Sequence, residues 1–353
     1  MAADVRRWAG SARGHRSRAR HAPLRAPCPP LGLPLAGGLA AGAVLDALIA
    51  DPRRGHPVAL FGRTAAAIEA RMYAGSRARG GLHAVICLLA ATAPAAAAQH
   101  LTRGRPALRL AATAAVSWAV IGAASLANEA KRLAQAVESG DLASARARLP
   151  SLCGRDPARL DADGLARAAV ESIAENTCDA VVAPLLWGSV AGLTGLAAYR
   201  AVNTLDAMVG HRSERYSDFG WASARLDDVA NAGPARLTGL LAAACAPVVG
   251  GRPAAALRGM KTFGGRHPSP NAGQCEAAFA GALGVRLGGT NVYDGVAEDR
   301  PLLGDGRAPG AADIRRAVLL SRAVTWAAVA IAAALAAAGS HRHEGPPTGR
   351  ERT

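Results

Sequence analysis

Carboxylates recur at helical spacing in residues 167–179, where the candidate chemistry of the sequence is densest. Glu171, Glu175 and Asp179 are four residues apart, so on a helix they form one acidic stripe, with Arg167 one turn before it. Like charges at this spacing repel unless a cation or a basic ligand lies between them. Carboxylate oxygens are ligands that Mg²⁺ prefers. The alternative is a solvated helix face, but an apolar run follows directly, which favours a stripe at a membrane surface.

A second stretch, residues 199–231, interleaves acids and amides with arginines. Asn203 and Asp206 are three residues apart and share one helix face. The same acid-and-amide chemistry recurs at Asp227, Asp228 and Asn231. The arginines between them are Arg200, Arg212, Arg215 and Arg225. This mixture suits a site that holds both phosphate and metal, and it equally suits a network of surface ion pairs.

Two loops rich in proline and glycine carry the remaining candidates. Residues 51–58 include His56 between two prolines, and residues 267–273 include His267 and Asn271. Prolines at this density stiffen a turn. Asn271 precedes a predicted helix at 274–284, whose free N–H groups would be available to an anion. A plain connector and a simple helix N-cap are the alternatives.

Apolar runs of membrane-spanning length separate these polar stretches. They cover 31–50, 82–98, 107–127, 180–202 and 317–339. Each approaches the roughly 20 residues that a transmembrane helix needs. A shorter run with a proline, 237–250, suits a buried or re-entrant segment. The sequence therefore predicts an all-α, polytopic integral membrane helical bundle with long polar loops and helical hairpins. A soluble all-α protein with alanine-rich buried helices is the alternative.

Composition sets the limits of the molecule. The 353 residues carry 41 Lys+Arg against 26 Asp+Glu, a net charge of +15, but the arginines are scattered and no nucleic-acid motif accompanies them. We therefore expect no nucleic-acid partner. The sequence has six cysteines, but no two of them form a C-x-x-C pair, and it has no Walker P-loop.

We expect a disordered basic extension at 1–30, a single membrane-embedded domain at 31–339 and a disordered tail at 340–353. We also expect one continuous helix over 116–137.

Four long sequence segments resemble those of one protein family. They are LDALIADPRRGHPVALFG at 45–62, ESIAENTCDAVVAPLLW at 171–187, the segment from YRAVNTLDAM to LTGLL at 199–241, and HPSPNAGQCEAAFAGALGVRLGG at 267–289. In this order they resemble the CobD/CbiB family of cobalamin-biosynthesis membrane proteins, the adenosylcobinamide-phosphate synthases. The resemblance implies amide formation between adenosylcobyric acid and (R)-1-aminopropan-2-ol or its O-phosphate. It also implies consumption of ATP with Mg²⁺.

The resemblance supplies no settled catalytic set, so the roles are assigned from residue types. The candidate catalytic residues are Glu171, Glu175, Asp206 and Asn203. The candidate substrate- or phosphate-binding residues are His56, Arg200, Arg225, Lys261, His267 and Asn271. The candidate metal ligands are Asp179, Asp227 and Asp228. A carboxylate near the amine would serve as its base.

Topology sets a condition on this site. If every apolar run spans, residues 203–236 lie on the opposite face from 51–81, 128–179 and 251–316. We therefore expect 180–202 with 237–250 to form a non-spanning hairpin, or one of these runs only to dip in. ATP supply places the site on the cytoplasmic face of the inner cell membrane. Expected partners are the corrinoid, aminopropanol or its phosphate, the lipid bilayer and other corrinoid-pathway enzymes. A non-catalytic AmpE-like membrane sensor or scaffold and a transporter are the rival functions.

Overall fold

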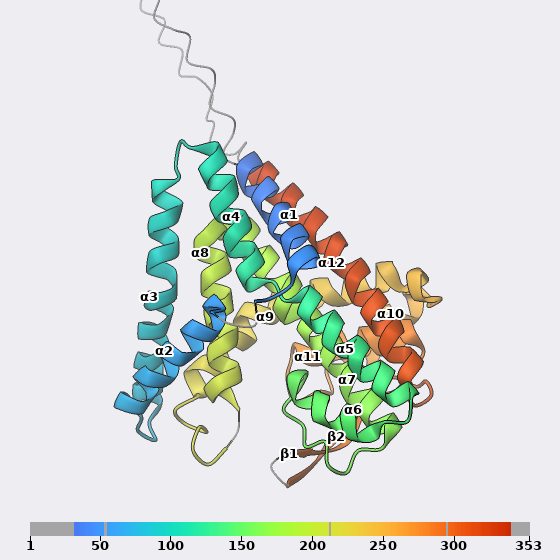
Figure 1. The fold of residues 1–353 in the computed structure, drawn as a ribbon. Coiled ribbons are helices and arrows are strands. Elements are labelled where there is room, and N and C mark those ends of the chain that lie inside the picture. Colours follow the sequence, from blue (N-terminus) through green and yellow to red (C-terminus); the bar gives the residue numbers. More distant parts are fainter. Residues whose placement is uncertain (1–31, 53–54, 212, 294–295, 340–353) are drawn as a thin grey trace, which may run out of the picture.

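A computed structural model of the chain describes residues 32–52, 55–211, 213–293 and 296–339. The extensions predicted at 1–30 and 340–353 lie outside these residues. Among the described elements helices dominate, and one two-stranded antiparallel sheet accompanies them (Figure 1). The predicted all-α helical bundle is confirmed.

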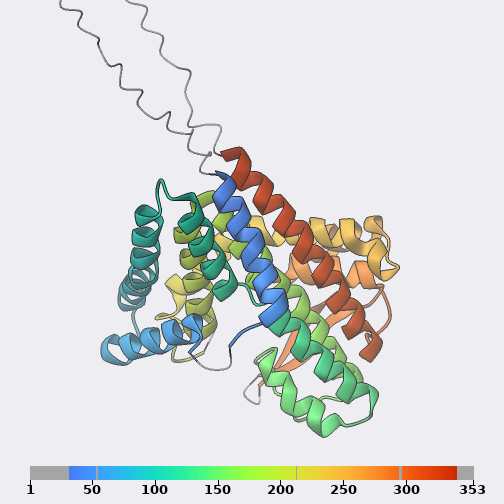
Figure 2. The same ribbon diagram turned by 45° about the horizontal axis from the view of Figure 1, so that its top comes forward.

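Among the residues that the structure describes, six helical segments are long and apolar enough to cross a membrane, which identifies a multi-pass membrane protein. They are α1 (Gly32–Ile49), α3 (Arg77–Leu101), α4 (Pro106–Val120) with α5 (Ala123–Glu138), α7 (Ala162–Thr177) with α8 (Ala183–Leu205), α9 (Trp221–Cys245) with η4 (Ala246–Val249), and α12 (Ala311–Gly339). α1 and α12 run side by side in both views (Figures 1 and 2). Each predicted apolar run overlaps with one of these segments.

Small residues allow α1 to pack closely on α4. A Cβ at Gly38 would lie 2.4 Å from the Thr113 side chain, and one at Gly42 would lie 2.3 Å from the Ser117 side chain. Gly38 and Gly42 are four residues apart, so they occupy one face of α1. Close approach of backbones through small residues is a common basis for helix association in lipid.

The third span is broken near its middle. α4 ends at Val120, and Ile121 has an extended backbone with ψ 138°. The prediction of one continuous helix over 116–137 is therefore wrong. Asp46, which is 1% exposed, accepts a hydrogen bond from the backbone N–H of Ala124 at 3.0 Å. This carboxylate satisfies one of the free donors that the new helix start creates.

The chain reverses direction inside α8, at Gly192. Gly192 has φ 65° and ψ −142°, a conformation open essentially only to glycine. A Cβ at Gly195 would lie 2.1 Å from the carbonyl oxygen of Trp187, a contact that a straight helix does not allow. The reversal lies within 180–202 alone and not between 180–202 and 237–250, so of the two expected arrangements it agrees with the one in which a single run dips in. Figure 1 shows the consequence: residues 213–220 lie at the same end of the bundle as residues 139–161.

The remaining described elements are shorter helices, helical turns and strands. They are α2 (Pro57–Met72), α6 (Leu142–Arg148), η1 (Leu149–Ser151), the π-helical turns η2 (Cys178–Val182) and η3 (Asp206–Gly210), α10 (Pro253–Phe263), α11 (Ala272–Leu283), β1 (Leu287–Tyr293) and β2 (Val296–Leu303). α2 lies across the long helices and not along them (Figures 1 and 2). The sheet was not predicted. It pairs β1 with β2 in antiparallel register, with an irregularity between Leu287 and Gly289.

Candidate functional site

A small cavity brings three of the singled-out stretches together. Its volume is about 20 Å³, room for roughly one water molecule or a small ion. The lining residues come from α7 and η2, from α9, and from the loop before α11 with the first turns of that helix. They are Glu175, Cys178, Asp179, Asp227, Asn231, Ala235, Ser269, Asn271, Ala272 and Cys275. Among the predicted site residues, Glu175, Asp179, Asp227 and Asn271 therefore share one cavity.

Two irregular helical turns place acids near this cavity. Asp179 is the second residue of η2, and Asp206 is the first residue of η3. Turns of π-helix are rare and are found frequently at functional sites. Asp206 is not a lining residue, but it is close enough to Asp227, Asp228 and Glu175 for their charges to repel it. The acids of the cavity thus belong to one larger electrostatic group.

A hydrogen-bonded chain connects the acids on opposite walls of the cavity. The hydroxyl of Tyr199 donates to Asn231 Oδ1 at 2.9 Å and lies 3.4 Å from Asp179 Oδ1. Asn231 in turn donates through Nδ2 to Asp227 Oδ2 at 3.0 Å. Three elements, η2, α8 and α9, are joined in this way. The reversal at Gly192 is what returns Tyr199 to this level of the bundle.

Asn271 forms the wall that α11 contributes. The predicted helix at 274–284 is observed as α11, and Asn271 is its N-cap residue. Its side chain makes no capping hydrogen bond, because Oδ1 accepts from Arg236 at 3.2 Å and Nδ2 donates to the carbonyl of Asp228 at 2.8 Å. The Ser269 hydroxyl oxygen accepts instead from the N–H of Ala272 at 3.2 Å. Asn271 therefore links the 267–271 loop to α9.

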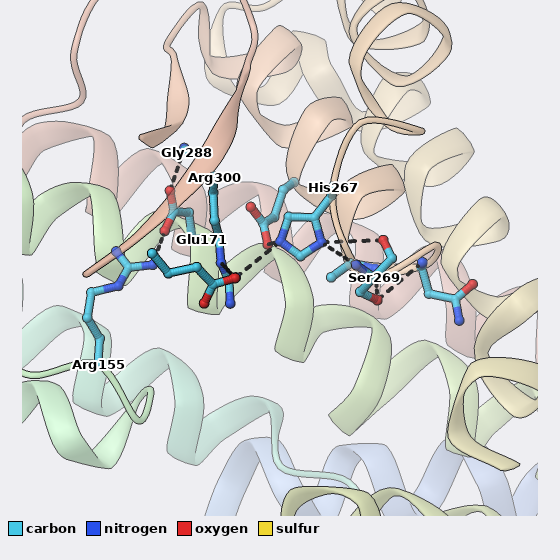
Figure 3. Close-up of polar contacts among 10 residues, drawn as sticks. Arg155, Glu171, His267, Ser269, Gly288 and Arg300 are labelled. Carbon is cyan, nitrogen blue, oxygen red and sulfur yellow. Dashed lines mark hydrogen bonds and ion pairs between the residues drawn. The ribbon is translucent and has the colours of Figure 1, made fainter. Parts of the chain in front are cut away.

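Glu171 belongs to a clamp beside the cavity and does not line it. Its carboxylate accepts from Arg155 Nη2 at 2.5 Å and from the backbone N–H of Gly288 at 2.7 Å (Figure 3). Both charged side chains are buried, at 5% and 7% exposure. Arg167 donates to the carbonyls of Gly288 and Thr290. We call Arg155, Glu171, Arg167 and Gly288 the α7 clamp, because together they tie α7 to the start of β1.

His267 lies between the cavity loop and the β-sheet. Its Nε2 is 3.1 Å from Arg300 Nη1, and its Nδ1 lies 3.0 Å from the backbone nitrogen and 3.3 Å from the carbonyl oxygen of Ser269 (Figure 3). Glu276 Oε1 lies 3.8 Å from the same Nε2. Burial, followed by the charge of Arg300, lowers the pKa of His267 below its ordinary value. Burial, followed by the charges of Glu171 and Glu175, raises the pKa of Glu276 well above its ordinary value.

The other predicted residues are outside the cavity. Arg200 Nη1 lies 3.5 Å from Asn203 Oδ1, and the Asn203 side chain lies within hydrogen-bonding reach of the Asp227 carboxylate. His56 caps α2 by accepting from the N–H of Val58, and its Nε2 lies 3.3 Å from Asp51 Oδ1. The outlying members lie on the surface: Arg225 pairs with Asp228 at 3.3 Å, and Lys261 is exposed on α10.

The predicted metal ligands do not form a ready-made ion site. Within the ranges that the structure describes, no group of three or more His, Cys, Asp or Glu side chains is arranged to hold a metal ion. Asp179 and Asp227 face the cavity, whereas Asp228 is engaged with Arg225. Mg²⁺ commonly takes only one or two carboxylates and completes its shell with water and phosphate. Asp179 and Asp227 suit that mode, and the metal stays a prediction.

Three residues of the site escaped the sequence reasoning. Arg155 is the buried partner of Glu171, Arg300 contacts His267, and Tyr199 connects the walls of the cavity. Tyr199 begins the second singled-out stretch, so its position offered a signal. Arg155 and Arg300 are two among many scattered arginines, and no local pattern distinguishes them.

Comparison with known proteins identifies the relatives of this chain. The profile of the family described as CobD/Cbib protein matches residues 39–321. A cobalamin biosynthesis protein CobD from Mycobacterium tuberculosis is 52% identical over 299 residues, covering 84% of this chain and 95% of that protein. A protein of the same description from Geobacter metallireducens is 46% identical over 270 residues, covering 74% and 84%. No solved structure matches the chain.

Proposed function

The chain belongs to the CobD/CbiB family and has a role in cobalamin biosynthesis, and from that premise we propose that it is an ATP-dependent amide synthase. The acid would be adenosylcobyric acid and the amine (R)-1-aminopropan-2-ol or its O-phosphate. The observation that carries the proposal is the cavity in which Glu175, Asp179 and Asp227 converge from two helices.

The reaction needs an activated carboxylate and a neutral amine. Transfer of the γ-phosphoryl group of ATP to the corrinoid carboxylate would give an acyl phosphate and ADP. The amine nitrogen then attacks the carbonyl carbon, the bond between that carbon and the phosphate oxygen breaks, and inorganic phosphate leaves. The extra proton on nitrogen must go to a base. A positioned carboxylate performs this transfer, an effect typically worth about 10²- to 10⁴-fold in rate.

The cavity residues suit the amine side of this reaction. An ammonium group is small enough for a space of about 20 Å³, whereas a corrin ring is not. The carboxylates of Glu175, Asp179 and Asp227 would attract it, and one of them would accept its proton. Glu171 is the exception among the predicted catalytic acids. Both of its oxygens are occupied by the α7 clamp, so we assign it to positioning β1.

Positive groups next to the cavity suit the phosphate side. Arg236 donates to the cavity residue Asn271, and Arg300 contacts His267. Arg200 lies 3.5 Å from Asn203. Guanidinium groups bind phosphate oxygens in paired, charge-assisted hydrogen bonds. When bound with ATP, Mg²⁺ would neutralise charge on the phosphates, and Asp179 and Asp227 are the carboxylates that fit it.

A single-face arrangement follows from the reversal at Gly192. It returns the chain before residues 213–220, which lie at the same end of the bundle as residues 139–161 (Figure 1). We place this end at the cytoplasmic side of the inner membrane, where ATP is available. Single cysteines at Ser139, Ser217 and Arg266 should all be labelled from the cytoplasmic side. Labelling from opposite sides would refute the arrangement.

The test is turnover by membranes that contain the chain. They are supplied with adenosylcobyric acid, ATP, Mg²⁺ and either amine, and the product is identified by mass. We expect the amide as product, with one ADP formed per amide. Membranes from cells that lack the chain serve as the blank. Corrinoid uptake without amide formation would indicate a transporter instead. Absence of product with both amines would overturn the proposed function.

A further inference from the structure

Tyr199 lies behind the cavity and has no role in the chemistry described so far. It is 2% exposed, and it is not among the residues that line the cavity. It belongs to the second half of α8, after the reversal at Gly192. Burying a phenol requires a partner for its hydroxyl. Here that partner is a cavity residue, Asn231, at 2.9 Å.

The hydroxyl has one proton and two neighbouring acceptors. Asn231 Oδ1 lies at 2.9 Å and Asp179 Oδ1 at 3.4 Å, so the proton belongs to the bond with Asn231. The thiol of Cys178 is the other donor to Asn231 Oδ1, at 3.7 Å, and thiols are weak donors. Tyr199 therefore supplies the strong hydrogen bond that holds the amide oxygen of Asn231.

This bond and the Asp227 carboxylate together fix the orientation of the Asn231 amide. With Oδ1 toward Tyr199, the Nδ2 group donates to Asp227 Oδ2 at 3.0 Å. The flipped amide would turn its oxygen toward the Asp227 carboxylate, placing two acceptors together, and would turn Nδ2 toward the Tyr199 hydroxyl. The orientation of an asparagine amide is set by its hydrogen-bond network in this way. The hydroxyl of Tyr199 thus acts on Asp227 through Asn231.

We propose that Tyr199 is a positioning residue of the amide-forming site. Its hydroxyl fixes the Asn231 amide, and the amide holds the Asp227 carboxylate in the orientation that meets the amine. This inference rests on the proposed function and adds a residue to it. Tyr199 does not contact the reacting atoms. Its loss therefore changes the rate of the chemical step and leaves corrinoid binding in place.

The first test is Tyr199→Phe, which removes only the hydroxyl. The kcat for amide formation should fall by about 10- to 100-fold, the scale expected when a reacting group is misplaced by about 1 Å. The KM for the corrinoid acid should stay unchanged. The matched control is Tyr216→Phe, because the Tyr216 hydroxyl also donates to a side-chain oxygen, Glu69 Oε1 at 2.8 Å, away from the cavity. It should keep the wild-type kcat.

The second test separates positioning from general stability. In Asn231→Ala there is no amide left to orient, so adding Tyr199→Phe to it should cause little further loss of kcat. Residues that act through one network are non-additive in this sense. Equal losses of kcat from Tyr199→Phe in both backgrounds would overturn the inference. So would a wild-type kcat in Tyr199→Phe alone.

A third readout does not depend on turnover. Cys178 lines the cavity beside Asn231 Oδ1, so a released amide should expose its thiol to methyl methanethiosulfonate. Peptide mass analysis should show faster modification of Cys178 in Tyr199→Phe than in the wild type or Tyr216→Phe. An unchanged rate would overturn the inference whatever the turnover. A wild type that makes no amide, with faster modification of Cys178 in the variant, would instead refute the proposed function alone.

Discussion

Glu171 and Asp179 belong to one acidic stripe, two helical turns apart, yet their surroundings are opposite. Glu171 is held by a guanidinium at 2.5 Å and a backbone N–H at 2.7 Å. Asp179 lines a cavity that it shares with two further carboxylates, and the Tyr199 hydroxyl, 3.4 Å away, directs its proton to Asn231 instead. One end of the stripe is satisfied within the fold, and the other leaves negative charge facing an open space.

The same contrast holds elsewhere in the molecule. Asp313, 1% exposed, is clamped by Arg307 and Arg316 and by the N–H of Gly310. Asp227, in the cavity, has an amide as its hydrogen-bond donor. A buried charge is tolerated when it is paired and hydrogen-bonded, and is costly when it is not. Carboxylates that lack this compensation are therefore the better candidates for binding a cationic ligand.

Removing the clamp should have the largest effect on stability. Glu171→Ala leaves Arg155 buried without its carboxylate, and breaking a buried ion pair in this way costs about 3–5 kcal/mol. The free energy of unfolding in detergent measures the loss. The control is Glu138→Ala, because Glu138 pairs with Arg315 at the same 2.5 Å but on the surface. Its stability should equal the wild type's, and an equal loss from both variants would refute the distinction.

The reversal in α8 returns Tyr199 to the level of the cavity, so a change at Gly192 tests the cavity end of the acidic stripe. Gly192→Ala places a Cβ at φ 65° and ψ −142°, and within 2.5 Å of the Gln99 side chain. Such strain costs about 1–3 kcal/mol. Thermal unfolding should show this loss, while Gly233→Ala, at an open helical position, should show none. If Gly192→Ala were as stable as wild type, the reversal would not depend on glycine.

The raised pKa of Glu276 predicts a smaller effect on stability, which depends on pH. Because the pKa of Glu276 is raised in the folded state, that state keeps a proton that the unfolded chain loses near pH 4.5. Stability therefore falls as the pH rises from this value toward the folded-state pKa. Glu276→Gln removes the ionisation, so its stability should fall less over that window. His267 is present in both proteins, so their difference isolates Glu276, and identical pH profiles would contradict the shift.

Most of the architecture could be predicted from the sequence, because apolar length and helical periodicity are local properties. The long helices and the helix after Asn271 follow from such patterns, whereas Asp227 was grouped with Glu175 and Asp179 because of its residue type and not because of any periodicity. The reversal at Gly192 could not be predicted, since a positive φ leaves no mark in a run that reads as one apolar helix. Nor could the break at Ile121, which depends on Asp46, 78 residues before Ala124.

The different roles of Glu171 and Asp179 within the acidic stripe could not be predicted from the sequence either. Spacing makes Glu171 and Asp179 equivalent, and only tertiary contacts distinguish them. Glu171 is clamped by Arg155, 16 residues earlier, and by Gly288, 117 residues later. The β-sheet that presents Gly288 was itself read as part of a polar loop. Long-range contacts of this kind set which acids are satisfied and which are left for a ligand.

The most direct test compares amide formation by Asp227→Asn with that by Asp218→Asn. Asp227 lines the cavity, whereas Asp218 forms an exposed ion pair with Arg77 at 3.0 Å. Membranes with matched protein levels receive adenosylcobyric acid, ATP and the amine. The account predicts a kcat lower by about 10²-fold or more for Asp227→Asn, with Asp218→Asn equal to wild type. Full activity in Asp227→Asn would contradict the claim that the cavity carboxylates perform the chemistry.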